Sequence, residues 1–197
     1  MCYSKNPLQR SIFILVILLA SVALAGNKPA STPGNEAPAA NASAPDVTEP
    51  SYRLHLYNTH TDEYIDVVYR RGETYDPEAI EQLDYFLRDS RNGTVAHFDP
   101  RLFDLLNELT ASVGRPEGEI DVVCGYRTPE TNRMLRRRSR RVAKHSLHMQ
   151  AMAIDIRLPG VTTRELRNAA LDLHRGGVGY YRRKAFVHVD VGPVRKW

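Results

Sequence analysis

Beyond residue 50, the chain alternates between segments with strand patterns and segments with helix patterns. Residues 52–58 and 62–71 alternate polar and apolar positions and are joined by a Thr-His-Thr turn, so both are predicted strands. Short apolar runs predict three more strands, at 119–124, 151–158 and 185–192. Five strands are therefore expected.

Four helices are predicted from capping signals and apolar stripes. Asp76-Pro77 and Asp99-Pro100 each place a capping Asp before a Pro at the first helical position, and Thr128-Pro129 opens a third, very basic helix. Thr162 and Glu165 form a capping box for the fourth, which should end near Gly176-Gly177. The pattern predicts an α+β fold, with helices packed on a small, mainly antiparallel sheet.

An export signal precedes the folded part. Residues 11–25 are apolar and uncharged, Lys5 and Arg10 come before them, and Ala23-Leu24-Ala25 matches a small-x-small cleavage site. Residues 1–25 are therefore predicted to be a signal peptide. A membrane anchor is the less favoured alternative, because the run is shorter than the roughly 20 residues that a spanning helix needs. We expect an exported, periplasmic protein with no stable membrane insertion after cleavage, or a membrane-tethered one if the signal is retained.

The composition separates a linker from the domain. Residues 26–50 hold five of the 12 prolines and almost no large apolar residue, which predicts a disordered Pro/Ala/Ser-rich linker before a domain at 51–197. Hydrophobic content of 42% and charged content of 25% are ordinary for a globular protein. Only Cys124 remains after removal of Cys2, so no internal disulfide is expected.

Positive charge is concentrated in one segment. Residues 133–144 hold seven of the 27 Arg and Lys residues, while the formal charge of the whole chain is only +4. This segment can attract an anionic polymer, or it is simply a solvated helix face. We expect no nucleic-acid partner, because an exported chain rarely meets nucleic acid and the segment has no interleaved aromatic residues for base stacking.

Three residues form a candidate metal site: His148, Asp155 and His188. Imidazole nitrogen and carboxylate oxygen suit zinc, and three protein ligands with one open position make a catalytic arrangement. His188 and Asp190 lie two apart on a predicted strand and so share a face. The spacing alone is a weak signal, and other divalent ions also bind such ligands.

Two motifs and the C-terminal segment resemble a known enzyme group. "SLHMQAMAID" (146–155) resembles the Ser-x-His-x-x-Gly-x-Ala-x-Asp motif of the zinc D-alanyl-D-alanine metallopeptidases, which share a fold with lysostaphin-like and Hedgehog N-terminal domains. "CGYRTPETN" (124–132) is similar to their Ser-Gly-Tyr-Arg-x-x-x-x-Asn segment. Residues 176–197 are similar to the murein endopeptidase K branch, and the resemblance spans the whole predicted domain.

The resemblance implies one Zn²⁺ ion held by His148, Asp155 and His188. It implies that Arg127 faces the substrate, binding a peptide carboxylate or steadying the oxyanion of the intermediate. It further implies hydrolysis of peptidoglycan cross-links during cell-wall remodelling. Two alternatives to this endopeptidase function stay open: a D,D- or L,D-carboxypeptidase on stem peptides, and a catalytically silent peptidoglycan-binding domain.

The sequence departs from the group at the general base. Relatives carry Glu or His two or three residues before the last zinc histidine, where this chain has Phe186 and Ala185. Asp190 is the predicted substitute, with orientation of His188 as its other role. An alternative assignment makes Asp190 a zinc ligand and His188 the base. His145 is a further candidate near the mouth of the site, although a surface residue is the favoured interpretation.

Smaller departures and contacts complete the predicted site. Cys124 stands where the group has Ser, and Ala151 where it has Gly, so the Ala151 methyl group either fits or narrows the path to the metal. Tyr126 and Tyr180 are predicted to contact substrate together with Arg127. Tyr180, Tyr181 and Trp197 either line the cleft or pack at the edge of the core, and the core edge is the expected place for Trp197.

Overall fold

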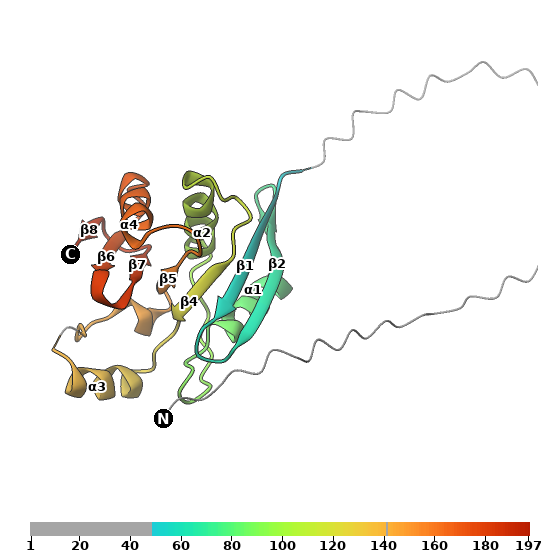
Figure 1. Cartoon of the computed structure of the whole chain (residues 1–197). Helices are drawn as coiled ribbons and strands as arrows, with labels where there is room; N and C mark the ends of the chain where they lie inside the picture. Colours follow the sequence, from blue (N-terminus) through green and yellow to red (C-terminus); the bar gives the residue numbers. More distant parts are fainter. Residues whose placement is uncertain (1–48, 141) are drawn as a thin grey trace, which may run out of the picture. The chain divides into compact units, whose positions relative to one another are not determined.

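The computed structural model describes residues 49–140 and 142–197, which form one eight-stranded sheet (Figure 1). The strands are β1 (Ser51–Asn58), β2 (Glu63–Arg71), β3 (Thr74–Tyr75), β4 (Ile120–Cys124), β5 (Ala153–Arg157), β6 (Gly177–Tyr181), β7 (Phe186–Asp190) and β8 (Arg195–Lys196). They lie in the order β3-β2-β1-β4-β5-β7-β6-β8. Two neighbouring pairs, β1–β4 and β6–β8, are parallel, and the others are antiparallel.

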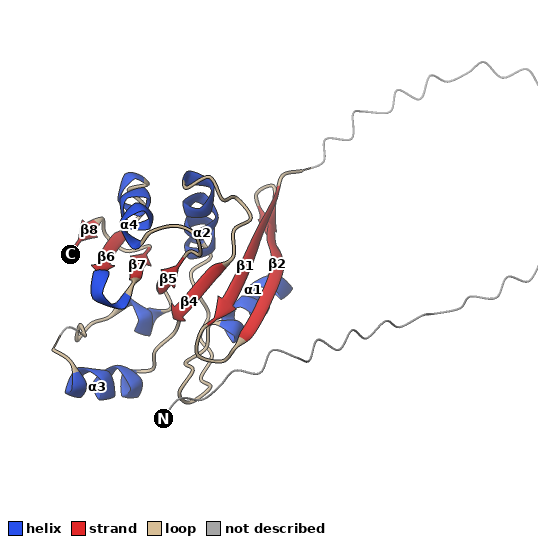
Figure 2. Ribbon diagram, in the orientation of Figure 1, coloured by secondary structure: helices blue, strands red, loops and turns tan. Residues whose placement is uncertain are grey.

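The helices begin largely where the capping signals place them. Figure 2 shows them in blue beside the red strands. They are α1 (Pro77–Phe86), α2 (Arg101–Ser112), α3 (Pro129–Arg138) and α4 (Thr163–Asp172), with 3-10 turns η1 (Leu147–Gln150) and η2 (Arg182–Lys184). Asp76 and Thr128 cap α1 and α3 with their side chains, and the Thr162–Glu165 capping box is complete at α4. Asp99 lies one residue further out than predicted, because α2 begins only at Arg101.

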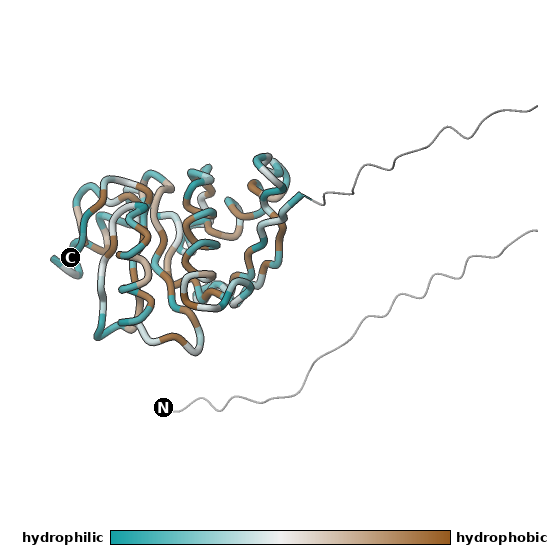
Figure 3. Tube along the Cα trace, turned by 90° about the horizontal axis from the view of Figure 1, so that it is seen from above, coloured by the Kyte–Doolittle hydropathy of each residue, from teal (hydrophilic) through white to brown (hydrophobic). Residues whose placement is uncertain are grey.

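One face of the sheet is covered by helices. Helix α2 packs on β1, α4 packs on β6 and β7, and α2 also contacts α4. Figure 3 shows hydrophobic stretches in brown and hydrophilic stretches in teal interspersed along the domain. Ile154, Val187 and Val189 belong to the hydrophobic core, and side chains alternate between the two faces along a strand. The alternate positions of β5 and β7, including Asp155 and His188, therefore lie on the opposite face. The predicted α+β class with a mainly antiparallel sheet is confirmed.

The glycine-rich strand β6 was not predicted. Its sequence, GVGYY, reads as the end of a helix followed by a turn, since glycine in a strand interior contributes no side-chain packing. The structure supplies the reason for the glycines. A Cβ at Gly177 would lie 2.5 Å from Asp190 Oδ2, and one at Gly179 would lie 2.7 Å from the Trp197 ring.

The predicted signal peptide (1–25) and most of the predicted linker (26–50) lie outside the described residues. Among the residues that are described, no helix is long and apolar enough to cross a membrane.

Asp89 connects the loop after α1 to the start of α3. Its buried carboxylate accepts hydrogen bonds from the Thr128 backbone N–H at 2.9 Å, the Thr128 hydroxyl at 3.0 Å and the Arg91 N–H at 3.0 Å. Burial raises the pKa of Asp89, but hydrogen bonds from Thr131, Thr128 and Arg91 outweigh it and lower the pKa overall. The folded state thus stabilises the carboxylate form of Asp89 relative to its protonated form.

Replacing Asp89 with asparagine should therefore lower the free energy of unfolding at pH 7 by about 1–3 kcal/mol. Because the folded pKa is lowered, the contribution of Asp89 is present above the unfolded pKa of about 3.9 and is lost as the pH falls through the folded value. Urea unfolding of both proteins at pH 7 and at pH 3 checks this, with exposed Asp172→Asn as the control. If the free energies of unfolding of wild type and Asp89→Asn differed by the same amount at both pH values, the prediction would be wrong.

Candidate metal centre and substrate groove

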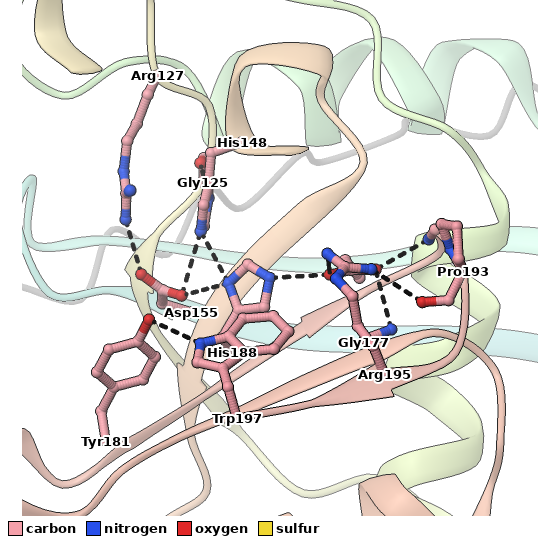
Figure 4. Close-up of polar contacts among 12 residues, drawn as sticks. Gly125, Arg127, His148, Asp155, Gly177, Tyr181, His188, Pro193, Arg195 and Trp197 are labelled. Atoms are coloured by element: carbon pink, nitrogen blue, oxygen red, sulfur yellow. Dashed lines mark hydrogen bonds and ion pairs between the residues drawn. The ribbon is translucent and has the colours of Figure 1, made fainter. Parts of the chain in front are cut away.

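Three side chains meet on the open face of the sheet (Figure 4). His148 comes from η1, Asp155 from β5 and His188 from β7, and Asp155 lies directly opposite His188 in the β5–β7 pair. His148 Nε2 lies 3.2 Å from Asp155 Oδ1 and 3.1 Å from His188 Nδ1, and His188 Nδ1 lies 2.9 Å from Asp155 Oδ1. All three residues are buried. The structure thus brings together the three metal ligands expected from the sequence.

The hydrogen bonds at the outer edges of both histidines set their tautomers. His148 Nδ1 lies 2.7 Å from the carbonyl oxygen of Gly125, and His188 Nε2 lies 3.1 Å from Asp190 Oδ2. Each of these nitrogens therefore carries a proton to donate, so that the neutral rings turn lone pairs toward each other and toward Asp155. Three acceptors that converge in this way need a cation between them. Ligands of a tetrahedral zinc ion with bonds of about 2.0 Å lie about 3.3 Å apart, which fits this spacing.

The pKa shifts favour a positive charge at the centre of the cluster. Burial lowers the pKa of His148, whereas Asp155 is held well below its ordinary pKa by His148 and His188, although burial opposes this. Burial also opposes protonation of His188, but hydrogen bonds to Asp155 and Asp190 raise its pKa overall. The cluster thus favours a cation, and either a proton or a metal ion satisfies this requirement.

Cys124 lies beside the cluster. Ligand atoms of Cys124, His148 and Asp155 all lie within 4.8 Å of one another, so these three could also hold an ion. However, burial raises the pKa of the Cys124 thiol to about 11, and its sulfur accepts a hydrogen bond from Arg127 Nε at 3.0 Å. Metal binding requires the thiolate. His188, with shorter distances to the other two ligands, is therefore the better third ligand.

Asp190 does not fit its predicted role as general base. Its side chain is fully buried and lines neither cavity described below. Oδ1 accepts from the backbone N–H groups of Gly177 and Gly192 at 2.9 Å, and Oδ2 accepts from His188 at 3.1 Å and from Arg195 Nη2 at 2.7 Å. A carboxylate occupied in this way cannot reach a substrate or an attacking water. Its contacts instead orient His188, which is the alternative drawn from the sequence.

Arg127 is tied to the cluster. Its Nη2 donates to Asp155 Oδ2 at 2.8 Å, which leaves Asp155 Oδ1 for the two histidines. Arg127 also lines both cavities, so its uncommitted N–H groups remain available to a substrate. The structure places it where substrate contact was expected and adds the anchoring of Asp155.

Two cavities meet at the cluster. The first, of about 880 Å³, contains His148, Asp155 and His188 in its lining, together with His145 and residues of η2. The second, of about 420 Å³, extends from Asp155 past Cys124 toward Arg91 and Arg157. The residues that line both are Arg127, Val142, Asp155, Lys184 and Phe186. The two cavities therefore adjoin at Asp155, and we call them together the substrate groove.

The aromatic wall of the groove differs from the prediction. Trp197 lies against His188, with ring centroids 5.1 Å apart, and its Nε1 donates to the Tyr181 hydroxyl at 3.1 Å. Tyr181 stacks on Phe186 at 4.5 Å. The expectation that Trp197 packs at the core edge is therefore wrong, since it lines the first cavity and is half exposed.

The two tyrosines predicted to contact substrate are less well placed. Tyr180 borders the first cavity, but its ring faces Arg167 of α4, whose guanidinium carbon lies 4.8 Å from the ring centroid. Tyr126 packs against the hydrophobic core and lines neither cavity. Tyr180 and Tyr181 of β6 must face opposite sides of the sheet, because side chains alternate along a strand. Tyr181 is the tyrosine on the side of Trp197, from which it accepts a hydrogen bond.

Ala151 has a conformational explanation. It ends η1 with φ of +52°, in the left-handed region that glycine adopts without a steric penalty. The glycine of the resembling motif is therefore explained by backbone conformation. The Ala151 methyl group packs in the core and lines neither cavity, so it does not narrow the path to the cluster.

Gly179→Ala should displace Trp197 from His188. The added Cβ would lie 2.7 Å from the indole, so we expect a loss of about 1–3 kcal/mol in the free energy of unfolding. Trp197 is the only tryptophan, so a shift in its emission maximum reports the displacement directly. In a Trp197→Ala background the same change should cost much less, and equal costs in both backgrounds would contradict the contact.

Known proteins share extensive sequence similarity with this chain. Residues 46–197 match the family model described as "Peptidoglycan L,D-endopeptidase MepK". The chain is 40% identical over 152 residues to the probable peptidoglycan L,D-endopeptidase MepK of Haemophilus influenzae, covering 77% of this chain and 82% of that protein. It is 42% identical over 144 residues to peptidoglycan L,D-endopeptidase MepK of Escherichia coli K12, covering 73% and 79%.

The region matched by the family model includes every residue of the metal cluster and the groove. The match also covers nearly all described residues, from β1 to Trp197. The chain therefore belongs to the peptidoglycan L,D-endopeptidase MepK family of metallopeptidases.

Proposed function

We propose that this protein is a zinc-dependent peptidoglycan L,D-endopeptidase that hydrolyses peptide cross-links of murein. The observation that carries the proposal is the position of the metal cluster at the meeting point of two cavities. Family membership supplies the substrate class, and the cluster supplies the chemistry. We further propose that the enzyme works in the periplasm, where this substrate lies.

His148 Nε2, Asp155 Oδ1 and His188 Nδ1 are the proposed zinc ligands. When bound, zinc acts as a Lewis acid that polarises an amide carbonyl and lowers the pKa of water to about 7. Gly125 and Asp190 hold the two imidazoles in the required tautomers, and Arg127 holds the far oxygen of Asp155. These contacts fix the directions of the ligand lone pairs before any metal arrives.

The open groove favours an endopeptidase over a carboxypeptidase. A carboxypeptidase needs room for a long chain on only one side of the scissile bond, where the leaving group is a single residue. A cross-link joins two stem peptides, so peptide must extend on both sides of the bond. The two cavities share Asp155 in their lining, so a stem peptide in each cavity would bring the bond between them to the cluster.

Arg127 and His145 are the proposed residues for charge and proton handling. The uncommitted N–H groups of Arg127 can donate to the oxygen on which negative charge develops. Outside the cluster, His145 is the one described histidine in the lining of the first cavity, and histidine is the side chain that most often transfers protons in catalysis. We therefore assign proton transfer to His145 rather than to Asp190.

His145→Ala should lower kcat on cross-linked dimers by about 10²-fold or more while zinc content stays at one ion per chain. The measurement is kcat across a pH series, together with metal analysis of the purified variant. His174→Ala is the matched control, because His174 is exposed and lines neither cavity. A variant with unchanged kcat would remove His145 from the mechanism.

The proposed function is tested on purified muropeptide dimers of two kinds, read by liquid chromatography and mass spectrometry. In one kind the cross-link joins an L-centre to a D-centre, and in the other it joins two D-centres. We expect zinc-loaded protein to convert only the first kind to monomers, and a chelator to stop the reaction. Shortened stems on intact dimers would indicate a carboxypeptidase, and intact dimers with intact stems would refute hydrolysis.

A further inference from the structure

We propose that the turn η2, with Arg182, Arg183 and Lys184, is a carboxylate-binding subsite. It would select stem peptides whose carboxylates are free over the same peptides with those carboxylates amidated. This inference rests on the proposed function, because it names the form of the substrate that the groove prefers. Arg127 is the cation that the sequence motif singles out, and η2 is separate from it in the chain.

Three consecutive cations belong to the lining of the substrate groove. Arg182, Arg183 and Lys184 all line the first cavity, and Lys184 also lines the second. All three are exposed to solvent. Within residues 49–140 and 142–197, none of them forms an ion pair. Their charges are therefore available to a ligand that occupies the groove.

The turn is held in place by the body of the sheet. Arg157 of β5 reaches across and donates from Nε to Ala185 O at 2.9 Å and from Nη2 to Lys184 O at 3.3 Å. Ala185 has φ of +52°, and its N–H bonds to Arg182 O at 3.2 Å, which closes the turn. A fixed turn presents its side chains at lower entropic cost than a mobile loop.

The rest of the lining matches an anionic ligand. Asp155 is the one acidic residue among those that line either cavity, and Arg127 and the two histidines already surround it. Arg91, Arg157 and Arg195 add further cations along the groove. Stem peptides carry several carboxylates close to their cross-link, and arginine binds carboxylates in bidentate geometry. Amidation would remove both the charge and this geometry.

The test compares Arg182→Gln/Arg183→Gln with a control that also removes two positive charges, Arg71→Gln/Arg164→Gln. Arg71 and Arg164 are exposed and line neither cavity. Each zinc-loaded protein receives cross-linked dimers with free carboxylates and the same dimers with amidated carboxylates. Binding of the uncleaved stem tetrapeptide, free-acid or amidated, is measured in parallel by calorimetry. That readout decides the inference even if no dimer is cut, which would count against the proposed function alone.

We expect the wild type and the control to bind the free-acid tetrapeptide about tenfold more tightly than the amidated one, with the same preference in kcat/KM. In Arg182→Gln/Arg183→Gln the preference should fall to about two- to threefold, mainly through weaker binding of the free acid. Equal binding of both tetrapeptides by the wild type would overturn the proposal. So would an undiminished preference in the double variant.

Discussion

His188→Ala should abolish hydrolysis of murein cross-links while leaving the protein folded. Removing one of three converging ligands removes the charge stabilisation that the metal supplies, so we expect kcat/KM to fall at least about 10³-fold. The alanine also removes the hydrogen bonds of His188 to Asp155 and Asp190 and its contact with Trp197. The metal-free variant should therefore unfold at a lower temperature than metal-free wild type while still showing a cooperative transition.

Metal-dependent stability separates this expectation from simple misfolding. Zinc that binds the folded state at 100 times its dissociation constant should add about 2.7 kcal/mol to the free energy of unfolding of the wild type. The variant should gain far less, and a chelator should remove the difference. His55→Gln, in β1 and away from both cavities, serves as the control and should behave as wild type. Equal zinc stabilisation of His188→Ala and wild type would contradict the ligand assignment.

Asp190→Ala should have the largest effect on stability. It would orphan the Nε2–H of His188 and the N–H groups of Gly177 and Gly192, whereas Arg195 is partly exposed and keeps its hydrogen bond to Pro193 O. Leaving donors of this kind unsatisfied costs about 1–3 kcal/mol each, so we expect a loss of about 3–5 kcal/mol in the free energy of unfolding. Chemical unfolding of the metal-free proteins measures this loss without interference from zinc affinity.

Asp190→Asn is the sharper variant for function, because asparagine keeps the shape and changes only charge and hydrogen bonding. If Asp190 orients His188, zinc affinity should fall about 10- to 100-fold, and activity should return at saturating zinc. If Asp190 were the general base, zinc affinity would be unchanged and kcat would stay low at any zinc concentration. Zinc titrations followed by both binding and kcat distinguish the two outcomes.

The local signals in the sequence predicted the helices better than the sheet. Asp76, Thr128 and Thr162 all cap helices as expected, because a cap depends on residues only a few positions away. The order of the strands depends on contacts between distant segments, and no local pattern encodes it. Strand β6 shows the difference, since its glycines are required by Asp190 and Trp197, which lie far along the chain.

The same contrast holds at the site. His148, Asp155 and His188 were predicted from their chemistry and a motif resemblance, and the structure brings them within hydrogen-bonding distance of one another. The general-base prediction for Asp190 followed from a shared strand face, and burial excludes it, because a shared face does not reveal which positions are covered. Arg195 and Trp197, which cover Asp190 and His188, could not be inferred without the short strand β8.

The pairing of β5 with β7 gives the metal a part in selecting the fold. Asp155 faces His188 across this pair, with Ile154 and Val189 facing each other one position along. A slip of one residue would turn His188 toward the core and bring a valine to the metal. Only the native alignment can then bind an ion. Zinc would thus discriminate between correctly and incorrectly aligned sheets, so an enzyme that cuts the cell wall would gain full stability only in the arrangement that is also active.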